Sequence, residues 1–165
     1  MGEMDKRYEQ IEHLSDVGLR AYGKSLEELF ENAGEGMFSI MCDLAKVSPL
    51  SRREIDIVER ENVSVEQLLI SWLENLLYLF EVEKMLFSSF KVHSVKVQSD
   101  KSNKDGREGD EKSKEARVKA EIFGEKIDFT KHEIIVAIKA PTYHTLEVKR
   151  DSLSGSWVAN VIFDI

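Results

Sequence analysis

The stretch SWVANVIFDI, residues 156–165, decides how the sheet of this protein must be built. Side chains alternate between the two faces of a β-strand, so this stretch divides into two sets. One face carries Trp157, Ala159, Val161, Phe163 and Ile165, and the other carries Val158, Asn160, Ile162 and Asp164. Both faces are largely apolar, which predicts a buried strand. A carboxylate in such surroundings is costly unless it is paired or binds a cation.

A second strand pattern lies near the start of the chain, in DVGLRAYG, residues 16–23, where apolar residues occupy alternate positions. If the last strand lies beside this one, Asp16 joins Asp164 and the terminal carboxylate of Ile165. Hard oxygen ligands of this kind favour Ca²⁺, with Mg²⁺ or Mn²⁺ as alternatives, over softer metals. The sequence therefore predicts a divalent-cation site that both ends of the chain build together.

The first helix is predicted over residues 25–45. Ser25 followed by Glu28 is a capping-box pair, and apolar residues then recur at helical spacing. Gly34 and Gly36 within this helix each cost about 1 kcal/mol relative to alanine. We therefore expect both glycines to be packing residues that allow close contact with a sheet.

A second helix is predicted to begin at Ser64. Gln67 completes its capping box, and Val63 is placed to pack on Leu68. The apolar stripe that continues to Phe80 is wide enough to cover one face of a sheet. This stripe indicates core packing and not a cofactor site.

Strand-like alternation accounts for most of the remaining chain. It occurs at 52–61, 90–97, 118–122, 134–138 and 146–148. Helices early and strands late predict the α+β class: a single two-layer domain with a mostly antiparallel or mixed sheet packed against two main helices. A chain of 165 residues with 42% apolar content is long enough to bury one core.

A charged insert, SDKSNKDGREGDEKSKE at residues 99–115, interrupts the strands and contains no aliphatic or aromatic residue. It is too polar to offset the entropy of ordering, so we expect a flexible hairpin tip within one domain spanning residues 1–165. Asp105, Gly106 and Asp110 suggest a calcium loop, but the ligand spacing and flanking helices of that motif are missing.

Composition excludes several classes of protein. A formal net charge of -8 argues against independent binding of nucleic-acid backbones. The lone Cys42 excludes an intramolecular disulfide and is expected to be a buried core thiol. The chain has no signal-peptide pattern, no P-loop and no dinucleotide fingerprint. A cytoplasmic protein that does not associate with a membrane is expected.

Polar residues cluster in EHLSD, just before the strand at 16–23, where Glu12 and His13 precede Asp16. A histidine three residues from a carboxylate can bind the same metal ion, or it can orient the carboxylate through a hydrogen bond. A polar entry to a strand explains the same residues without any ligand.

A second polar cluster, KAPTYH at residues 139–144, contains Lys139, Tyr143 and His144. Pro141 is predicted to break the strand ladder, so a bend or bulge could direct Tyr143 and His144 into a shared cleft. A kinked edge strand with satisfied polar groups accounts equally well for the pattern.

Taken together, five segments resemble the archease family in order and spacing. They are EHLSDVGLRAYGKSLEELFENAGEGMF, WLENLLYLF, GEKIDFTKHE, KAPTYHTLEV and VIFDI. The resemblance extends from about residue 8 to residue 165 apart from the charged insert, which looks longer than the family's turn. The family's HTAD motif reads HLSD here, with His13 and Asp16 matching and Leu14 and Ser15 departing. The K-A-x-T-Y-H signature is intact.

The resemblance implies an accessory protein of RtcB-type tRNA-splicing ligases. Such proteins promote guanylylation of the ligase histidine, allow multiple turnovers and broaden nucleotide use, without being ligases themselves. It assigns metal binding to Asp16 and to the terminal pair Asp164 and Ile165, and it places Asp43 on the functional surface. Contact with RNA would be indirect.

Two other functions use the same residues. A divalent-metal phosphoesterase or nuclease would activate water with these carboxylates, although the sequence indicates neither a second metal site nor a basic substrate groove. A binding module would use its cation only to tie the two chain ends together.

Overall fold

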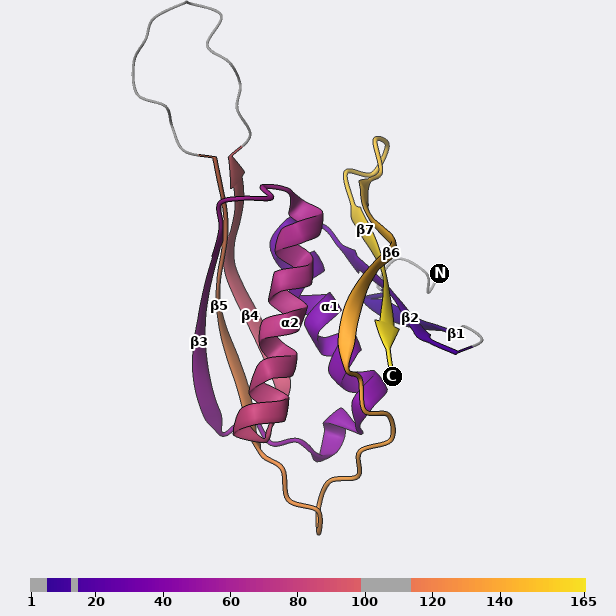
Figure 1. Cartoon of the computed structure of the whole chain (residues 1–165), viewed down its shortest axis with the longest axis vertical. Helices are drawn as coiled ribbons and strands as arrows, with labels where there is room; N and C mark the ends of the chain where they lie inside the picture. Colours follow the sequence, from indigo (N-terminus) through magenta and orange to yellow (C-terminus); the bar gives the residue numbers. More distant parts are fainter. Residues whose placement is uncertain (1–5, 13–14, 99–113) are drawn as a thin grey trace, which may run out of the picture.

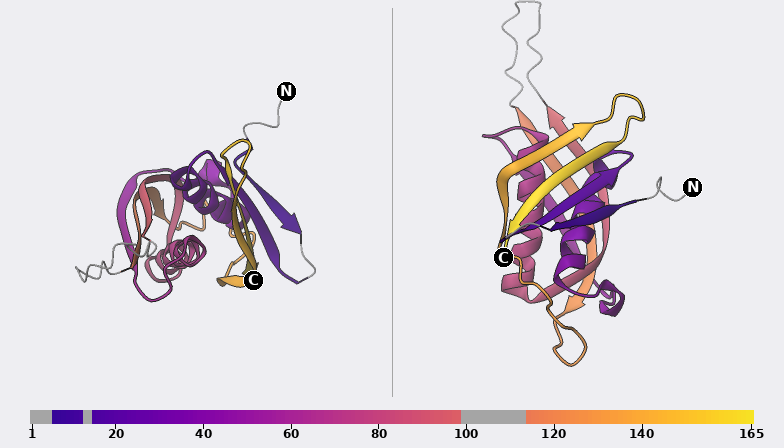
Figure 2. Two further views of the ribbon diagram at one scale, coloured as in Figure 1. Left: turned by 90° about the horizontal axis from the view of Figure 1, so that it is seen from above. Right: turned by 90° about the vertical axis from the view of Figure 1, so that its right-hand side faces the viewer.

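The computed structural model describes residues 6–12, 15–98 and 114–165. Two α-helices lie between two antiparallel sheets, with strand orders β1-β2-β7-β6 and β3-β5-β4 (Figures 1 and 2). The first half comprises β1 (Tyr8–Glu12), β2 (Val17–Gly23), α1 (Leu26–Met41), the 3₁₀ helix η2 (Leu44–Lys46), β3 (Ser51–Glu59) and α2 (Val65–Glu83). The second half comprises β4 (Met85–Gln98), β5 (Glu115–Lys126), β6 (Ala140–Arg150) and β7 (Trp157–Asp164).

The predicted α+β class with two main helices is confirmed, and the strands divide into two sheets that cover opposite sides of the helices. β4 and β5 pair as far as Gln98 and Glu115, so the charged insert connects two neighbouring strands. The residues at 99–113, on which a flexible tip was predicted, lie outside the described part of the chain. Within that part, neither helix combines the length and apolar character needed to cross a membrane.

Helix α1 begins as predicted, because the Ser25 hydroxyl accepts a hydrogen bond from the Glu28 amide at 3.1 Å. Its two glycines allow close contacts on both sides. A Cβ atom on Gly34 would lie 3.1 Å from Leu76 of α2, and one on Gly36 would lie 2.7 Å from Leu19 of β2. The interpretation of both glycines as packing residues is confirmed.

Helix α2 begins at the predicted cap, where the Ser64 hydroxyl accepts from the Gln67 amide at 3.1 Å. The buried Trp72 connects the two helices, because its indole N–H donates to the Phe30 carbonyl of α1 at 2.9 Å. Burial of large aromatic side chains is among the strongest contributions to a core. The helices therefore form a common layer on which both sheets pack.

Cys42 is buried at the end of α1, as predicted. Burial raises the pKa of its thiol to about 11, and the nearby negative charge of Asp43 acts in the same direction. A thiol held in its neutral form is a poor nucleophile. Cys42 is thus a packing residue.

The strand predicted at 134–138 is wrong, because these residues form an irregular segment between β5 and β6. This segment runs beneath the helix ends from one sheet to the other (Figure 1). The Ile135 amide donates to the Met41 carbonyl at 2.8 Å instead of to a strand. Ile138 is buried while Ile135 is 64% exposed, so the alternation reflects one side of an irregular segment packed on the core.

Candidate functional site

The predicted meeting of the first long strand with the end of the chain is confirmed. β2 pairs with β7 in antiparallel register, from Val17 opposite Phe163 to Gly23 opposite Trp157. Asp16 directly precedes this ladder on β2, and Asp164 directly follows Phe163 on β7. The two aspartates therefore occupy neighbouring positions at one end of the ladder.

The register also determines the face on which Asp164 lies. Val17 and Phe163 are buried against the helices, with exposed fractions of 8% and 0%. Successive side chains of a strand point to opposite faces. Asp164 therefore faces away from the helices, on the open face of the four-stranded sheet, and Asp16 lies beside this end of β7, just before β2 begins.

The prediction that β7 is buried on both faces is wrong. Its inward residue Phe163 belongs to the core, but Asn160 and Ile162 on the other face are only half-buried, and Asp164 is exposed. Among the described residues, no helix or strand layer covers this face (Figure 2). Water can therefore solvate the Asp164 carboxylate, so the carboxylate needs no buried counter-charge. Any cation bound there would also be in contact with solvent.

Two of the predicted supporting residues lie close to the aspartates. The Lys139 amide donates to the Asp164 carbonyl at 2.8 Å, which places the exposed Lys139 side chain at the end of β7. Glu12 is opposite Val17 in the β1–β2 ladder, one position from Asp16. His13 lies outside the described residues.

Asp43 has a local structural role at the end of α1. Its carboxylate accepts a hydrogen bond from the Ala45 amide at 3.1 Å and caps the 3₁₀ helix η2. The side chain is exposed. The neighbouring bond between Ile135 and Met41 connects this region with the segment that continues to Lys139.

Tyr143 and His144 lie in an irregular part of β6. Pro141 does not break the ladder as predicted, because it remains opposite Phe163 at the sheet edge. The irregularity comes later, between Thr142 and Glu147. The Tyr143 hydroxyl donates to the Gln67 amide oxygen of α2 at 2.9 Å, and His144 is exposed. This arrangement is a kinked edge strand, the simpler of the two interpretations.

Asp16 and Asp164 supply the hard oxygen atoms that Ca²⁺, Mg²⁺ or Mn²⁺ prefer, in a position open to solvent. Within residues 6–12, 15–98 and 114–165, no group of three or more His, Cys, Asp or Glu side chains is arranged to hold a metal ion. The third predicted ligand is the main-chain carboxylate of Ile165, a residue that is exposed. The donor chemistry thus fits a solvent-accessible hard cation.

His132 has no predicted role, yet its side chain is buried and anchors the segment between β5 and β6. Its Nδ1 accepts from the Asp128 amide at 3.0 Å, so the proton is on Nε2, which donates to the Lys46 carbonyl at 3.0 Å. Glu125 lies beside it and accepts hydrogen bonds from Lys131 at 2.7 Å and from the Ser48 amide. This network connects η2 to the segment that leads to Lys139. The sequence did not predict the burial of His132, because a histidine in a polar loop belongs to no periodic apolar pattern.

Replacing Glu125 by glutamine is expected to reduce the acid sensitivity of folding. Hydrogen bonds from Lys131, the Ser48 amide and His132 lower the pKa of Glu125 from 4.5 to about 2. A lowered folded-state pKa adds stability above the unfolded value, and that stability is lost as pH falls through the folded value. The Glu125 side chain is 17% exposed, and the expected loss is on the order of 2 kcal/mol. Urea unfolding of Glu125→Gln at a series of pH values should show a shallower decline between 4.5 and 2 than the wild type.

The exposed Glu133 provides a matched control, because it is a neighbouring glutamate outside this network. Glu133→Gln should follow the wild-type pH profile. A Glu125→Gln profile parallel to the wild type would contradict the assigned role of the network.

Comparisons with known proteins agree with this geometry. The model of the Archease protein family (MTH1598/TM1083) matches residues 8–165. The chain is 35% identical over 165 residues to Protein archease of Methanosarcina barkeri, covering 100% of both chains. It is 37% identical over 160 residues to Protein archease of Sulfurisphaera tokodaii, covering 97% of this chain and 99% of the relative. The solution structure of protein 1598 of Methanobacterium thermoautotrophicum is similar with a TM-score of 0.70 and 30% identity, covering 96% of this chain and 98% of the other.

Proposed function

The chain belongs to the archease family, and from this premise we propose that it is a non-catalytic accessory protein that activates an RtcB-type tRNA-splicing RNA ligase. Its proposed role is to promote guanylylation of the ligase, so that one ligase molecule joins many RNA substrates. It would also broaden the ligase's use of nucleotides. The partner is the ligase itself, and RNA would be contacted only through it.

The observation that supports this proposal most directly is the β2–β7 ladder, which brings Asp16 and Asp164 to neighbouring positions at one end of the ladder. A pair of accessible carboxylates on rigid strands can approach a partner without rearrangement of the fold. The net charge of -8 favours encounter with a basic, phosphate-handling site. These features suit a protein that acts on a ligase active site from outside.

We assign cation binding to Asp16, Asp164 and the terminal carboxylate of Ile165. When bound, a divalent cation would supply positive charge that phosphate oxygens can recognise. The strands hold the two aspartates in register. Lys139, anchored through its amide to Asp164, adds a cationic side chain to the same end of the sheet. Glu12, His13, Asp43, Tyr143 and His144 are assigned to the surrounding functional surface.

A ligation assay with RNA in excess over a cognate ligase, with GTP present, tests the proposed function. The ligase alone should form about one product per active site, and addition of this protein should give many. Direct measurement of GMP attached to the ligase should show faster guanylylation. Equal product yields with and without the protein would overturn the proposal.

The same preparation distinguishes the two other functions. A phosphoesterase would hydrolyse a phosphodiester reporter with added metal and no ligase. If the cation were only structural, its removal would lower thermal stability, while protein refolded without metal would still stimulate the ligase. Neither behaviour is expected of an activator that uses the cation at the ligase.

A further inference from the structure

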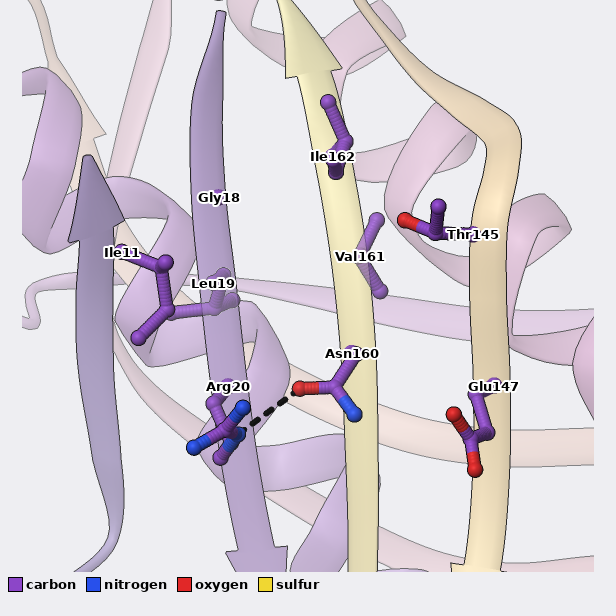
Figure 3. Close-up of a pocket in the computed structure, with 9 residues that line it drawn as sticks. All are labelled: Ile11, Gly18, Leu19, Arg20, Thr145, Glu147, Asn160, Val161 and Ile162. Atoms are coloured by element: carbon purple, nitrogen blue, oxygen red, sulfur yellow. Dashed lines mark hydrogen bonds between the residues drawn. The ribbon is translucent and has the colours of Figure 1, made fainter. Parts of the chain in front are cut away.

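The open face of the four-stranded sheet is hollowed next to the two aspartates. The hollow has a volume of about 260 Å³ and extends from Ile11 on β1, across Gly18 and Ile162, to Thr145 and Glu147 on β6. Figure 3 shows these residues on four adjacent strands, with the helices behind the sheet. No side chain of the mechanism proposed above lines it.

Two local features create the hollow. Gly18 leaves the centre of the face without a side chain, and Ile11 lies so close that a Cβ atom on Gly18 would be 3.0 Å from its Cβ. On the other side, β6 loses register with β7 between Thr142 and Glu147. The missing side chain of Gly18 and the unpaired part of β6 therefore leave a depression on this face of the sheet.

Thr145, within this irregularity, has a φ of 52°. A β-branched residue is rarely found in the left-handed region, because its side chain crowds the backbone. Such strain is retained mainly where a particular shape is useful. The widened space between β6 and β7 is therefore a candidate for a binding feature.

The chemistry of the hollow indicates what it can hold. Ile11, Gly18 and Ile162 provide an apolar surface. The polar rim is internally satisfied. Arg20 donates to the Asn160 amide oxygen at 2.8 Å and forms an ion pair with Glu9 at 3.5 Å, and Glu147 is paired with Lys149. No uncompensated cation is left on this rim for a phosphate. The hollow is also below the roughly 300–1,000 Å³ typical of small-molecule sites. An inserted apolar side chain of a protein partner fits both the size and the chemistry.

The position of the hollow identifies which partner would cover it. Gly18 is two residues from Asp16 along the chain, and Ile162 is two residues from Asp164 on the same face of β7, a separation of about 7 Å. A stable protein interface covers about 800 Å² of each partner. A ligase that contacts the aspartates would therefore also cover the hollow, and its basic site complements the acidic end of this face.

We propose that the hollow at Gly18, Ile162 and Thr145 receives a large apolar side chain of the ligase and anchors the complex. This inference rests on the proposed function. Burial of one such side chain in a fitted pocket is a common source of interface affinity. The aspartates would then act on the ligase site, while the hollow holds the two proteins together.

Thr145→Trp tests this inference, because the exposed Thr145 can carry a larger side chain that fills the hollow, and tryptophan lacks the β-branch that crowds this backbone. Titration of the purified ligase by calorimetry should show a dissociation constant raised about tenfold or more. At saturating concentration Thr145→Trp should still give the wild-type maximal stimulation. Leu153→Trp is the matched control, because Leu153 is 96% exposed in the β6–β7 turn, outside the hollow. It should bind like the wild type.

The outcomes separate the two proposals. Equal affinities of Thr145→Trp and the wild type would overturn the anchoring role and leave ligase activation intact. A wild type that neither binds nor stimulates the ligase would overturn both. Binding of GTP by the wild-type protein alone, abolished in Thr145→Trp, would show that a nucleotide occupies the hollow and would overturn the assignment of a partner side chain.

Discussion

Replacing Asp164 by asparagine is expected to reduce the products formed per ligase molecule from many to about one. The exchange keeps the size and hydrogen-bonding capacity of the side chain but removes its charge. Asp164 is exposed at the end of β7 and its carbonyl still accepts from Lys139, so the fold should be unaffected. Loss of one carboxylate from a site with few ligands should greatly weaken binding of a hard cation. Multiple-turnover ligation measures the first effect, and metal titration measures the second.

The control must remove the same charge elsewhere. Asp56 is exposed on β3, in the other sheet, and pairs with Arg117 at 2.6 Å. Asp56→Asn should retain full stimulation, since an exposed ion pair contributes at most about 1 kcal/mol. Asp16→Asn should behave like Asp164→Asn. If all three variants stimulated the ligase equally, the aspartates would have no part in activation.

The terminal carboxylate can be tested without deleting any side chain. One residue appended after Ile165 moves that charge along the chain, while Asp16 and Asp164 remain in place. The extended protein should lose most stimulation but keep the unfolding midpoint of the wild type. Normal stimulation would remove the carboxylate of Ile165 from the proposed ligand set.

Gly124→Ala should have the largest effect on stability. Gly124 lies in β5 between two neighbouring strands, where its partners are Ser51 and Phe87. A Cβ atom added there would be 1.8 Å from the Leu86 carbonyl oxygen, so the backbone itself would have to move. The irregular register of β4 just after Phe87 accompanies this close approach. We expect a loss of about 3 kcal/mol or more in the free energy of unfolding, measured by urea titration.

Gly34→Ala is the matched substitution. Gly34 is also buried, but the added Cβ would be 3.1 Å from side-chain atoms of Leu76 and Phe90, which can shift. Alanine gains about 1 kcal/mol of helix propensity over glycine, which offsets much of the crowding. The net change should be within about 1 kcal/mol. Similar losses in the two variants would show that backbone contact is not what makes Gly124 necessary.

The residue patterns predicted the pairing of β2 with β7 better than they predicted the arrangement of the strands around it. Alternation identified β2 and β7 as strands, and the carboxylates at their ends suggested that the two strands lie side by side. The short, polar strand β1 was missed because an edge strand needs few apolar residues. The alternation of Ile134 and Ile138 was misread, since packing on a core from one side produces the same period as a sheet.

Other features depend on contacts that no local pattern encodes. Burial of His132 depends on carbonyl and amide groups contributed by Lys46 and Asp128. The hollow depends on the bend of β6, which begins after Pro141 and not at it. The strands divide into two sheets according to the side of the helix layer that each strand covers. The local sequence does not predict that side, because it depends on packing in the complete core.

The order of β1-β2-β7-β6 has a consequence for biosynthesis. Of the strands that the structure describes, β7 is translated after all the others, yet it lies in the interior of its sheet between β2 and β6. Residues paired across the β2–β7 ladder, such as Arg20 and Asn160, are 140 residues apart in sequence. Contacts between such distant residues form late and slowly. A nascent polypeptide interrupted before Trp157 would leave both flanking strands without their shared neighbour. The four-stranded sheet can therefore close only after β7 has been translated, because β7 is the neighbour that β2 and β6 share.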